Sequence, residues 1–377
     1  MQYRIHESID EIPAVQWNAL NREGNPFLCH EFLAALEHHG CVGPRYGWLP
    51  RHISAWEGGV LVGVMPLYLK DNSYGEFVFD FAWAEAYQRQ GRAYYPKLVS
   101  AIPYTPASGE RLLLARGREE ATGEGLVARA VSLAGALGVS SVHWLFPTRA
   151  QQGQLKAQGL VERLGCQFHW SNRGYGDFDD FLAALSSKRR KNIRRERRQV
   201  REAGIRLELL HGPEVSEAQW RTFTRFYLRT FEDYGSLPTL NEGFFREVAQ
   251  TLGRRVILIL AHDRAGCVGG ALLYRGGDTL YGRHWGSLRE HPGLHFEACY
   301  YQGIEYCIRE GLVRFEPGAQ GEHKIWRGFL PTLTYSAHWI ADPGFRSAIT
   351  EFLHRERPLI ADYARTLSEA SPYRKGD

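Results

Sequence analysis

The feature that most constrains the fold is an internal repeat, because the second half of the chain follows the same order of elements as the first. The stretch Val62-Gly63-x-x-x-Leu67-Tyr68 recurs as Val268-Gly269-x-x-x-Leu273-Tyr274, each time inside an apolar segment that indicates a β-hairpin. Later in each half, a predicted strand ends at Pro147 or Pro317, and the Trp of a His-Trp pair follows 23 and 22 residues on. We therefore predict two copies of one β-β-(β)-α-β-α-β unit.

The division that this repeat implies is 1–172 and 173–377, with a Tyr/Phe/Trp-rich insertion at about 70–110 in the first copy. A chain of 377 residues is also too long for one ordinary core. In the first copy we expect a hairpin at 52–68, strands at 111–115 and 142–147, helices at 123–137 and 149–158, and a strand ending at Trp170. In the second we expect strands at 256–261, 267–274, 279–286, 313–317 and 333–340, and helices at 294–310 and 322–328. Residues 1–40 are predicted to be helical and peripheral.

A strongly basic segment lies between the two copies. Residues 188–201 hold nine Lys or Arg and one acid, Glu196, so this segment carries +8 while the rest of the chain carries about −4. Ser186-Ser187 and Gly204 are typical ends for a helix, so we predict a basic helix over 186–204. Like charges at i, i+4 repel, and a bound phosphate would relieve that repulsion. The predicted phosphate-binding residues are Lys188, Arg190, Lys191, Arg194, Arg195 and Arg198; the alternative is a solvated basic face without a ligand.

The cysteines and the N-terminal sequence indicate the compartment. The six cysteines show no Cys-x-x-Cys pair and no zinc spacing, which is typical of reduced thiols. The N-terminus lacks an apolar signal core, and no uncharged apolar run approaches the length of a membrane span. We therefore expect a cytoplasmic protein with no membrane span, no metal site and no tightly bound cofactor. The sequence does not predict the oligomeric state.

The element order is that of the GCN5-related N-acetyltransferase (GNAT) fold, and four strings make the resemblance more specific. They are Ser-Tyr-Gly-Glu-Phe-Val-Phe-Asp (73–80), Tyr-Tyr-Pro-Lys (94–97), Ser-Lys-Arg-Arg-Lys-Asn-Ile-Arg-Arg-Glu-Arg (187–197) and Phe-Glu-Pro-Gly-Ala-Gln-Gly-Glu-His-Lys (315–324). With them the chain resembles the FemAB-like N-acyltransferases, relatives of the Fem-type aminoacyltransferases. The resemblance implies an α/β (α+β) fold of tandem duplicated GNAT-like domains with a basic helix between the copies.

The resemblance also implies a reaction, the transfer of an aminoacyl or acyl group to an amine. The acceptor would be a small-molecule or peptide amine, such as a peptidoglycan precursor. The donor would be aminoacyl-tRNA, which makes tRNA a candidate partner, or acyl-CoA. GNAT enzymes bind pyrophosphate with an Arg/Gln-x-x-Gly-x-Gly/Ala loop, and both places where it belongs, 283–288 and 118–123, are degenerate. A third reading is a non-catalytic RNA- or precursor-binding module.

Two polar segments of the second copy are candidates for the chemistry. Acyl transfer to an amine needs a base for the ammonium proton and donors for the oxyanion. Glu316, His323 or Glu297 could be the base, and Lys324 or Arg283 a donor. We place the proton transfer near Glu316, His323 and Lys324. The second copy also supplies predicted substrate-binding residues: Arg283, His284, Trp285, His295, Tyr301, Gln320 and Arg327.

The insertion in the first copy adds further candidate substrate-binding residues. Glu76 and Asp80 form a carboxylate pair that could bind a substrate amine, or they could be ordinary strand-end residues. With Tyr74, Tyr94 and Lys97, they would line a cleft between the copies if the insertion folds over it.

Overall fold

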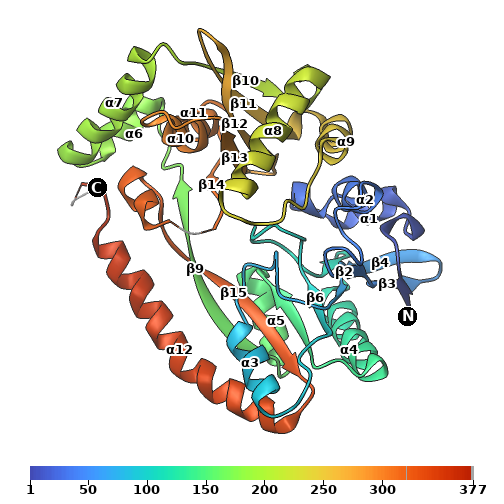
Figure 1. Cartoon of the computed structure of the whole chain (residues 1–377). Helices are drawn as coiled ribbons and strands as arrows, with labels where there is room; N and C mark the ends of the chain where they lie inside the picture. Colours follow the sequence, from blue (N-terminus) through green and yellow to red (C-terminus); the bar gives the residue numbers. More distant parts are fainter. Residues whose placement is uncertain (320, 375–377) are drawn as a thin grey trace. The chain divides into compact units, whose positions relative to one another are not determined.

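The computed structural model describes residues 1–319 and 321–374 as a mixed α/β protein (Figure 1). Its elements include those predicted from the repeat in the predicted order, together with further helices and strands. They are β1 Gln2–His6, η1 Ile9–Glu11, α1 Ala14–Leu20, η2 Pro26–Leu28, α2 His30–His38, β2 Trp48–Pro50, β3 His52–Glu57, β4 Val60–Met65, β5 Tyr68–Lys70, α3 Phe81–Arg89, β6 Lys97–Ser100, β7 Leu113–Leu114, α4 Glu119–Leu137, β8 Ser141–Leu145, α5 Arg149–Ala157, β9 Val161–Ser171, α6 Phe178–Ala184, α7 Ser187–Glu202, β10 Arg206–His211, η3 Gly212–Glu214, α8 Glu217–Asp233, α9 Glu242–Leu252, η4 Gly253–Arg255, β11 Val256–Asp263, β12 Gly266–Gly276, β13 Thr279–Ser287, α10 Leu294–Phe296, η5 Glu297–Tyr301, α11 Gln302–Arg309, β14 Arg314–Glu316, η6 Glu322–Arg327, β15 Leu330–Ile340 and α12 Pro343–Glu369.

The chain forms two compact units that are not simply its two halves. The first unit contains residues 1–166 and 333–364, and the second contains 167–332 and 365–377. Residues 336–340 of β15 pair with β8 in the first unit, while Trp170 and Ser171 of β9 pair with β14 in the second. The end of the last strand of each predicted copy, 167–171 of β9 and 333–340 of β15, therefore belongs to the unit built mainly from the other half. Residues 333–364 differ in this way from the predicted range 173–377, because strand pairing and not chain order decides where they pack.

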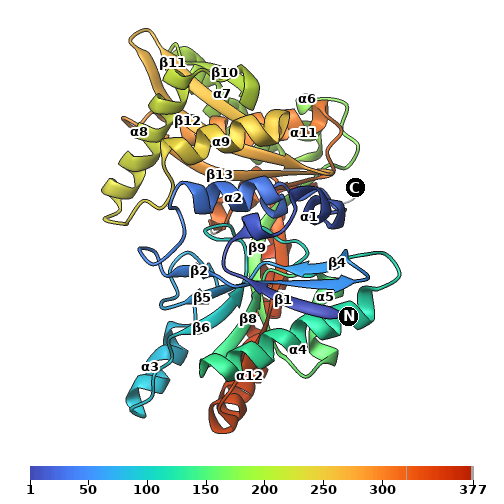
Figure 2. The same ribbon diagram turned by 90° about the vertical axis from the view of Figure 1, so that its right-hand side faces the viewer.

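The first unit contains two sheets, one with strand order β1-β3-β4-β7 and one with β15-β8-β6-β5-β2. Helix α4 covers β3, β4, β6 and β8 (Figure 2), and its buried residues Leu126, Val127 and Ala130 form a core with Trp144. The prediction that residues 1–40 are helical and peripheral is only partly right, because α1 and α2 form but the segment is not peripheral. The segment begins with strand β1, which pairs antiparallel with β3, and α2 buries the residues that the helical spacing selected, Phe32, Leu33 and Leu36.

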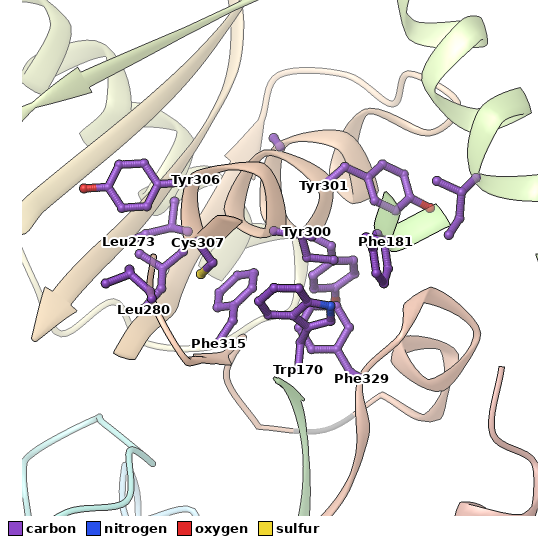
Figure 3. Close-up of a cluster of buried hydrophobic side chains, with 14 of the residues drawn as sticks. Trp170, Phe181, Leu273, Leu280, Tyr300, Tyr301, Tyr306, Cys307, Phe315 and Phe329 are labelled. Carbon is purple, nitrogen blue, oxygen red and sulfur yellow. The ribbon is translucent and has the colours of Figure 1, made fainter. Parts of the chain in front are cut away.

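The second unit is built on a sheet with strand order β10-β11-β12-β13-β14-β9. Its predicted hairpin, β11–β12, thus lies in a different sheet from the β3–β4 hairpin of the first unit. Helices α8 and α9 cover one face of the sheet (Figure 2). A separate core packs Trp170, Phe315 and Phe329 against Tyr300 and Tyr301 (Figure 3).

The predicted basic helix forms as α7, Ser187–Glu202. Ser186 is the N-cap, and Gly204 has a positive φ of 70°, which lets the amide of Ile205 bond back to the carbonyl of Val200. Its apolar side chains Ile193 and Val200 are both 1% exposed. One narrow apolar stripe thus anchors the helix.

Candidate functional site

A pocket of about 390 Å³ in the second unit collects most of the predicted polar residues of the second copy. It is formed by β12, β13, the start of the α10–α11 region and the segment after β14. Six of its lining residues were predicted as catalytic or substrate-binding residues: Arg283, His284, Trp285, His295, His323 and Lys324. Gln320, another predicted binding residue, lies outside the described residues.

The pocket lies where two parallel strands part. β13 and β14 pair over three residues, ending at Tyr281 opposite Glu316. After that point Gly282 and Pro317 line the pocket. The next residue, Gly318, has φ +90°, a conformation that favours glycine, and it turns the chain away from the sheet. The Pro-Gly pair that the sequence places after this strand therefore helps to form the opening.

The equivalent place in the first unit is filled. There β6 and β8 pair in parallel through Ser100 and Trp144. Beyond them the guanidinium of Arg111, which is 0% exposed, donates to the carbonyl oxygens of Leu145 at 2.6 Å and Ala107 at 2.7 Å. A ligand that enters between parting strands thus finds space in the second unit and a buried arginine in the first.

The charged side chains of the second-unit pocket favour an anionic ligand or transition state. Arg283 and Lys324 are cations, and none of the described residues that line the pocket is acidic. Burial lowers the pKa of Arg283 to about 10 and that of Lys324 to about 8. The Lys324 ammonium donates to the carbonyl oxygens of Gly318 at 2.8 Å and Ala319 at 3.2 Å. An ammonium has three N–H donors, so the described residues leave one of them for a ligand.

The histidines of the pocket are neutral at pH 7. Burial, assisted by nearby cations, lowers the pKa of His323, and it lowers the pKa of His295 to about 4. The Nε2 atom of His323 is 3.1 Å from the hydroxyl of Tyr300. A neutral imidazole can accept a proton, so His323 has the protonation state that a base for an ammonium requires.

Glu316 lies behind the pocket and does not line it. Its side chain is 4% exposed at the end of β14. Its Oε1 atom is 4.0 Å from His169 Nδ1 and 3.9 Å from Arg314 Nε, and its charge also acts on Arg283. Burial lowers the pKa of His169 to about 3, so this histidine is neutral. Of the two preferred bases, His323 is therefore the one that reaches the pocket.

Glu297 is engaged in an ion pair and does not line the pocket. Its two carboxylate oxygens accept from Arg197 at 3.1 and 3.0 Å, and Gln302 donates to it at 2.9 Å. Arg197 also binds Glu305 at 2.7 Å. These contacts fix α7 to the α10–α11 region, so they favour a structural role for Glu297 over that of a base.

Tyr301 and Arg327 likewise bind α7 rather than the pocket. Both contact the carboxylate of Glu196; Arg327 donates to it from Nη2 at 2.7 Å and from Nε at 3.3 Å, and Tyr301 through its hydroxyl. The guanidinium of Arg327 also lies over the ring of Phe296 at 3.4 Å. The only acid within residues 188–201 thus points inward and holds η6.

The predicted phosphate-binding residues mostly remain at the surface of α7. Arg190 is half-buried and lies 3.4 Å from the carbonyl oxygen of Leu185. The other five are exposed: Lys188, Lys191, Arg194, Arg195 and Arg198. Arg194 and Arg198 form surface ion pairs with Asp179 and Glu202. We call the five residues together with exposed Arg201 the α7 cationic face.

In the first unit, the structure brings four of the five predicted residues together. Lys97 is 0% exposed and donates to Glu76 at 2.8 Å, to Asp80 at 2.5 Å and to Ser73 at 2.8 Å. Tyr94 donates to Asp80 at 2.5 Å. The cation that pairs with the two carboxylates is thus the protein's own lysine, which favours a structural network. The fifth residue, Tyr74, is 73% exposed. Substrate binding by these residues remains a prediction.

Two lining residues of the pocket with a thiol or a hydroxyl group were not among the predicted site residues. Cys299 and Tyr300 line it from η5, a π-helical turn over Glu297–Tyr301 within the predicted helix 294–310. An i→i+5 turn changes which side chains face inward, and π-turns are often found at functional sites. Hydrophobic periodicity cannot reveal such a turn, because it assumes a regular helix.

Metal-binding clusters and membrane-spanning helices are absent from the described residues. Over residues 1–319 and 321–374, no three His, Cys, Asp or Glu side chains are placed to hold a metal ion. Over the same residues, every helix is too short or too polar to cross a bilayer.

Solved structures share the fold over nearly the whole chain. FemX matches with 14% identity and a TM-score of 0.54, covering 93% of this chain and 100% of its own. The C-terminal domain of a putative lysylphosphatidylglycerol synthetase from Agrobacterium fabrum matches with 9% identity and a TM-score of 0.56, covering 91% and 96%. A tandem GNAT protein of clavulanic acid biosynthesis matches with 14% identity and a TM-score of 0.48, covering 91% and 99%. The match to FemX, whose TM-score is above 0.5, confirms the predicted Fem-type fold.

Sequence comparison identifies the family. No curated protein sequence matches the chain. The sequence pattern of the FemAB-like family, described as peptidoglycan biosynthesis/recognition, matches residues 8–375. This span includes both units, the pocket and α7, so the chain belongs to the FemAB-like family.

Proposed function

We propose that this protein transfers an aminoacyl or acyl group to an amine and that the transfer takes place in the pocket between β13 and β14. The observation that carries the proposal is the convergence of six predicted residues on one pocket with two cations and neutral histidines. Membership of a peptidoglycan biosynthesis/recognition family supports a peptide or a cell-wall precursor as the acceptor. The donor brings the acyl group, so the reaction needs no tightly bound cofactor.

The residues of the pocket suit each step of such a transfer. The acceptor ammonium gives a proton to the neutral imidazole of His323, and the amine lone pair then attacks the acyl carbon. The carbonyl oxygen becomes an oxyanion, which Lys324 and Arg283 stabilise. When the tetrahedral intermediate collapses, the bond to the donor oxygen or sulfur breaks. That atom leaves as an alcohol or thiol with the proton from His323, and the second proton of the attacking nitrogen passes to solvent, which leaves a neutral amide.

The α7 cationic face supports a phosphate-rich donor, and we favour aminoacyl-tRNA over acyl-CoA. Six exposed cations on one helix suit an extended polyanion better than one pyrophosphate. The GNAT pyrophosphate loop is degenerate in both copies, which argues in the same direction. The acyl-CoA alternative keeps the same pocket and the same base, but leaves most of this face without a ligand.

The test is a transfer assay with charged tRNA and CoA thioesters as donors and a panel of amines that includes peptidoglycan precursors. In His323→Ala we expect turnover to fall by about 10²–10⁴-fold, or roughly 3–5 kcal/mol in the barrier. His354→Ala removes an exposed histidine of α12 and is the matched control. If His323→Ala keeps parental turnover and Glu316→Gln loses it, Glu316 is the base. If both keep it with unchanged folding, the transfer takes place elsewhere.

Charge reversal on α7 tests whether the acyl donor is aminoacyl-tRNA or acyl-CoA. Lys191→Glu with Arg195→Glu changes two exposed cations at i, i+4, and Arg221→Glu with Arg225→Glu makes the same change on α8. With aminoacyl-tRNA as donor, we expect KM for the donor to rise strongly in the α7 variant only. If no donor turns over but tRNA binds, the non-catalytic RNA-binding reading replaces the enzyme.

A further inference from the structure

Another pocket, of about 360 Å³, lies in the second unit and shares no described lining residue with the pocket between β13 and β14. Its lining residues come from the ends of β10, α9, β12 and α11 and from η4. We call it the Tyr306 pocket, after the tyrosine of α11 that lines it. The proposed transfer reaction uses none of these residues.

The floor of the Tyr306 pocket holds a buried hydroxyl group. Tyr306 is 1% exposed, and its ring points away from Cys307 and Phe315 with the hydroxyl outermost (Figure 3). The Arg275 guanidinium lies beside this hydroxyl, but no described residue meets the geometry of a hydrogen bond to its oxygen. Burial raises the pKa of Tyr306, so the group keeps its proton at pH 7 and can donate it. Buried polar groups in proteins normally have a partner, and a ligand oxygen would supply one here.

The rim of the Tyr306 pocket is cationic. Three arginines and one glutamate line it, Arg254, Arg255, Arg275 and Glu310, which leaves a net charge of +2. The Glu310 carboxylate accepts from Arg275 at 3.0 Å and also from Arg309 at 3.3 Å, so one negative charge is shared by two guanidinium groups. The positive charge at the rim is therefore only partly neutralised within the protein.

The wall between β10 and η4 is fixed by close contacts. The Nδ1 atom of His211 is 2.9 Å from the carbonyl oxygen of Arg254, and a carbonyl can only accept, so Nδ1 donates. At Gly212, a Cβ atom would lie 2.6 Å from the carbonyl oxygen of Ala249 and 2.7 Å from that of Gly253. Only glycine allows this approach of η3 to the end of α9. A pocket with fixed walls loses little conformational freedom when a ligand binds.

The donors of the Tyr306 pocket fit a phosphate group better than a carboxylate. A terminal phosphate carries close to two negative charges and three oxygens that accept strongly, whereas a carboxylate has one charge and two oxygens. Arginine binds phosphate with two parallel N–H donors. The hydroxyl at the floor is almost completely buried, so it can be reached by a small molecule and not by the backbone of a duplex.

We propose that the Tyr306 pocket binds the terminal phosphate or diphosphate group of a small molecule. Arg254, Arg255 and Arg275 contact the phosphate oxygens, and the Tyr306 hydroxyl donates to one of them. This site is separate from the pocket of the proposed transfer reaction and does not depend on that reaction.

The experiment is isothermal titration calorimetry of the full-length protein with pyrophosphate and with inorganic phosphate, and with citrate as a carboxylate comparison. Tyr306→Phe removes only the hydroxyl and should weaken pyrophosphate binding roughly 10- to 150-fold, as expected for a hydrogen bond to a charged group. Arg254→Gln with Arg275→Gln should also weaken it, because the rim loses two cations. Tyr234→Phe is the matched control, since Tyr234 is 82% exposed at the end of α8, and it should bind like the parent. Thermal unfolding checks that each variant is folded.

Two further variants separate this site from the other cationic regions of the second unit. Lys324→Met removes a cation of the β13–β14 pocket, and Lys191→Glu with Arg195→Glu reverses charges on the α7 cationic face. In both backgrounds, Tyr306→Phe should still weaken pyrophosphate binding.

Three results would overturn the proposal. The first is no measurable binding of either phosphate probe. The second is pyrophosphate binding that is unchanged in Tyr306→Phe, or that is lost in Lys324→Met or in the α7 variant. The third is citrate binding as tight as that of pyrophosphate, which would make the ligand a carboxylate. The titration needs no acyl donor, so its outcome is independent of whether the transfer reaction is confirmed.

Discussion

Replacing Glu196 by Ala should destabilise the second unit far more than removing any exposed acid of α7. The Glu196 carboxylate is 17% exposed, and the Arg327 side chain that it pairs with is 7% exposed. Without Glu196, the guanidinium stays buried and loses two hydrogen bonds, at 2.7 and 3.3 Å, and the Tyr301 hydroxyl loses its acceptor.

The size of the effect follows from the burial. Removing one partner of a buried ion pair costs about 3–5 kcal/mol. Because Glu196 retains some contact with water, we expect the lower end, about 3 kcal/mol. At roughly 2–4 °C per kcal/mol for a domain of this size, the Tm should fall by about 6–12 °C. In Glu196→Ala/Arg327→Met no unpaired cation remains, so the double variant should be more stable than the sum of the single changes implies.

The assay is urea and thermal unfolding followed by circular dichroism. The matched control is Glu202→Ala. Glu202 is 68% exposed, and its carboxylate lies 3.7 Å from Arg198 Nε. Such a surface ion pair contributes less than about 1 kcal/mol to stability. Equal shifts in Glu196→Ala and Glu202→Ala would refute the reasoning, because the Glu196–Arg327 pair would then add no more stability than an exposed ion pair. Additive effects in the double variant would show that the pair is not coupled.

Three further predictions concern buried titratable groups. Lys97→Met leaves the carboxylates of Glu76 and Asp80 unpaired in the first unit, and it should lower the free energy of unfolding by about 3–5 kcal/mol in urea titrations; a loss below 1 kcal/mol would contradict the network. Burial lowers the pKa of His295 to about 4, so the unfolded chain is protonated at a higher pH than the folded chain. The free energy of unfolding should therefore fall as the pH drops from about 6.5 to 4. His295→Gln should reduce this dependence of stability on pH, and an unchanged dependence would exclude His295 as a source. The pKa of Lys324 is about 8, so activity that depends on its ammonium should decline as the pH rises through 8; Lys324→Arg should move that limb upward, and a profile without the limb would exclude the role.

The sequence was sufficient to predict the helices and strands that depend on neighbouring residues. The hairpins, the strands that end at Pro147 and Pro317, and the basic helix all form within a few residues of their predicted bounds. Alternating apolar residues and glycine or proline stops act over a few residues, so they can be identified without the fold. The repeat and the four sequence strings shared with the family similarly predicted the tandem fold.

Only part of the candidate site could be predicted from the sequence. The segment around His323 and Lys324 was identified because a strand, a Pro-Gly turn and a polar helix follow one another in the chain. Glu297 was the next candidate for the base, since a carboxylate on a helix face gives no sign of its partner. The partner, Arg197, is 100 residues away, and only the folded chain brings the two together.

The sequence by itself determined the repeat, the order of the elements and the charge of α7, because each depends on neighbouring residues. The tertiary structure decided the rest. It placed residues 333–364 in the first unit through the pairing of β15 with β8, and it filled the opening between β6 and β8 with Arg111 while the one between β13 and β14 stayed open. It also turned Glu196 inward to hold η6. Strand pairing and buried ion pairs join residues far apart in the chain, and their energy depends on burial, which no local pattern specifies.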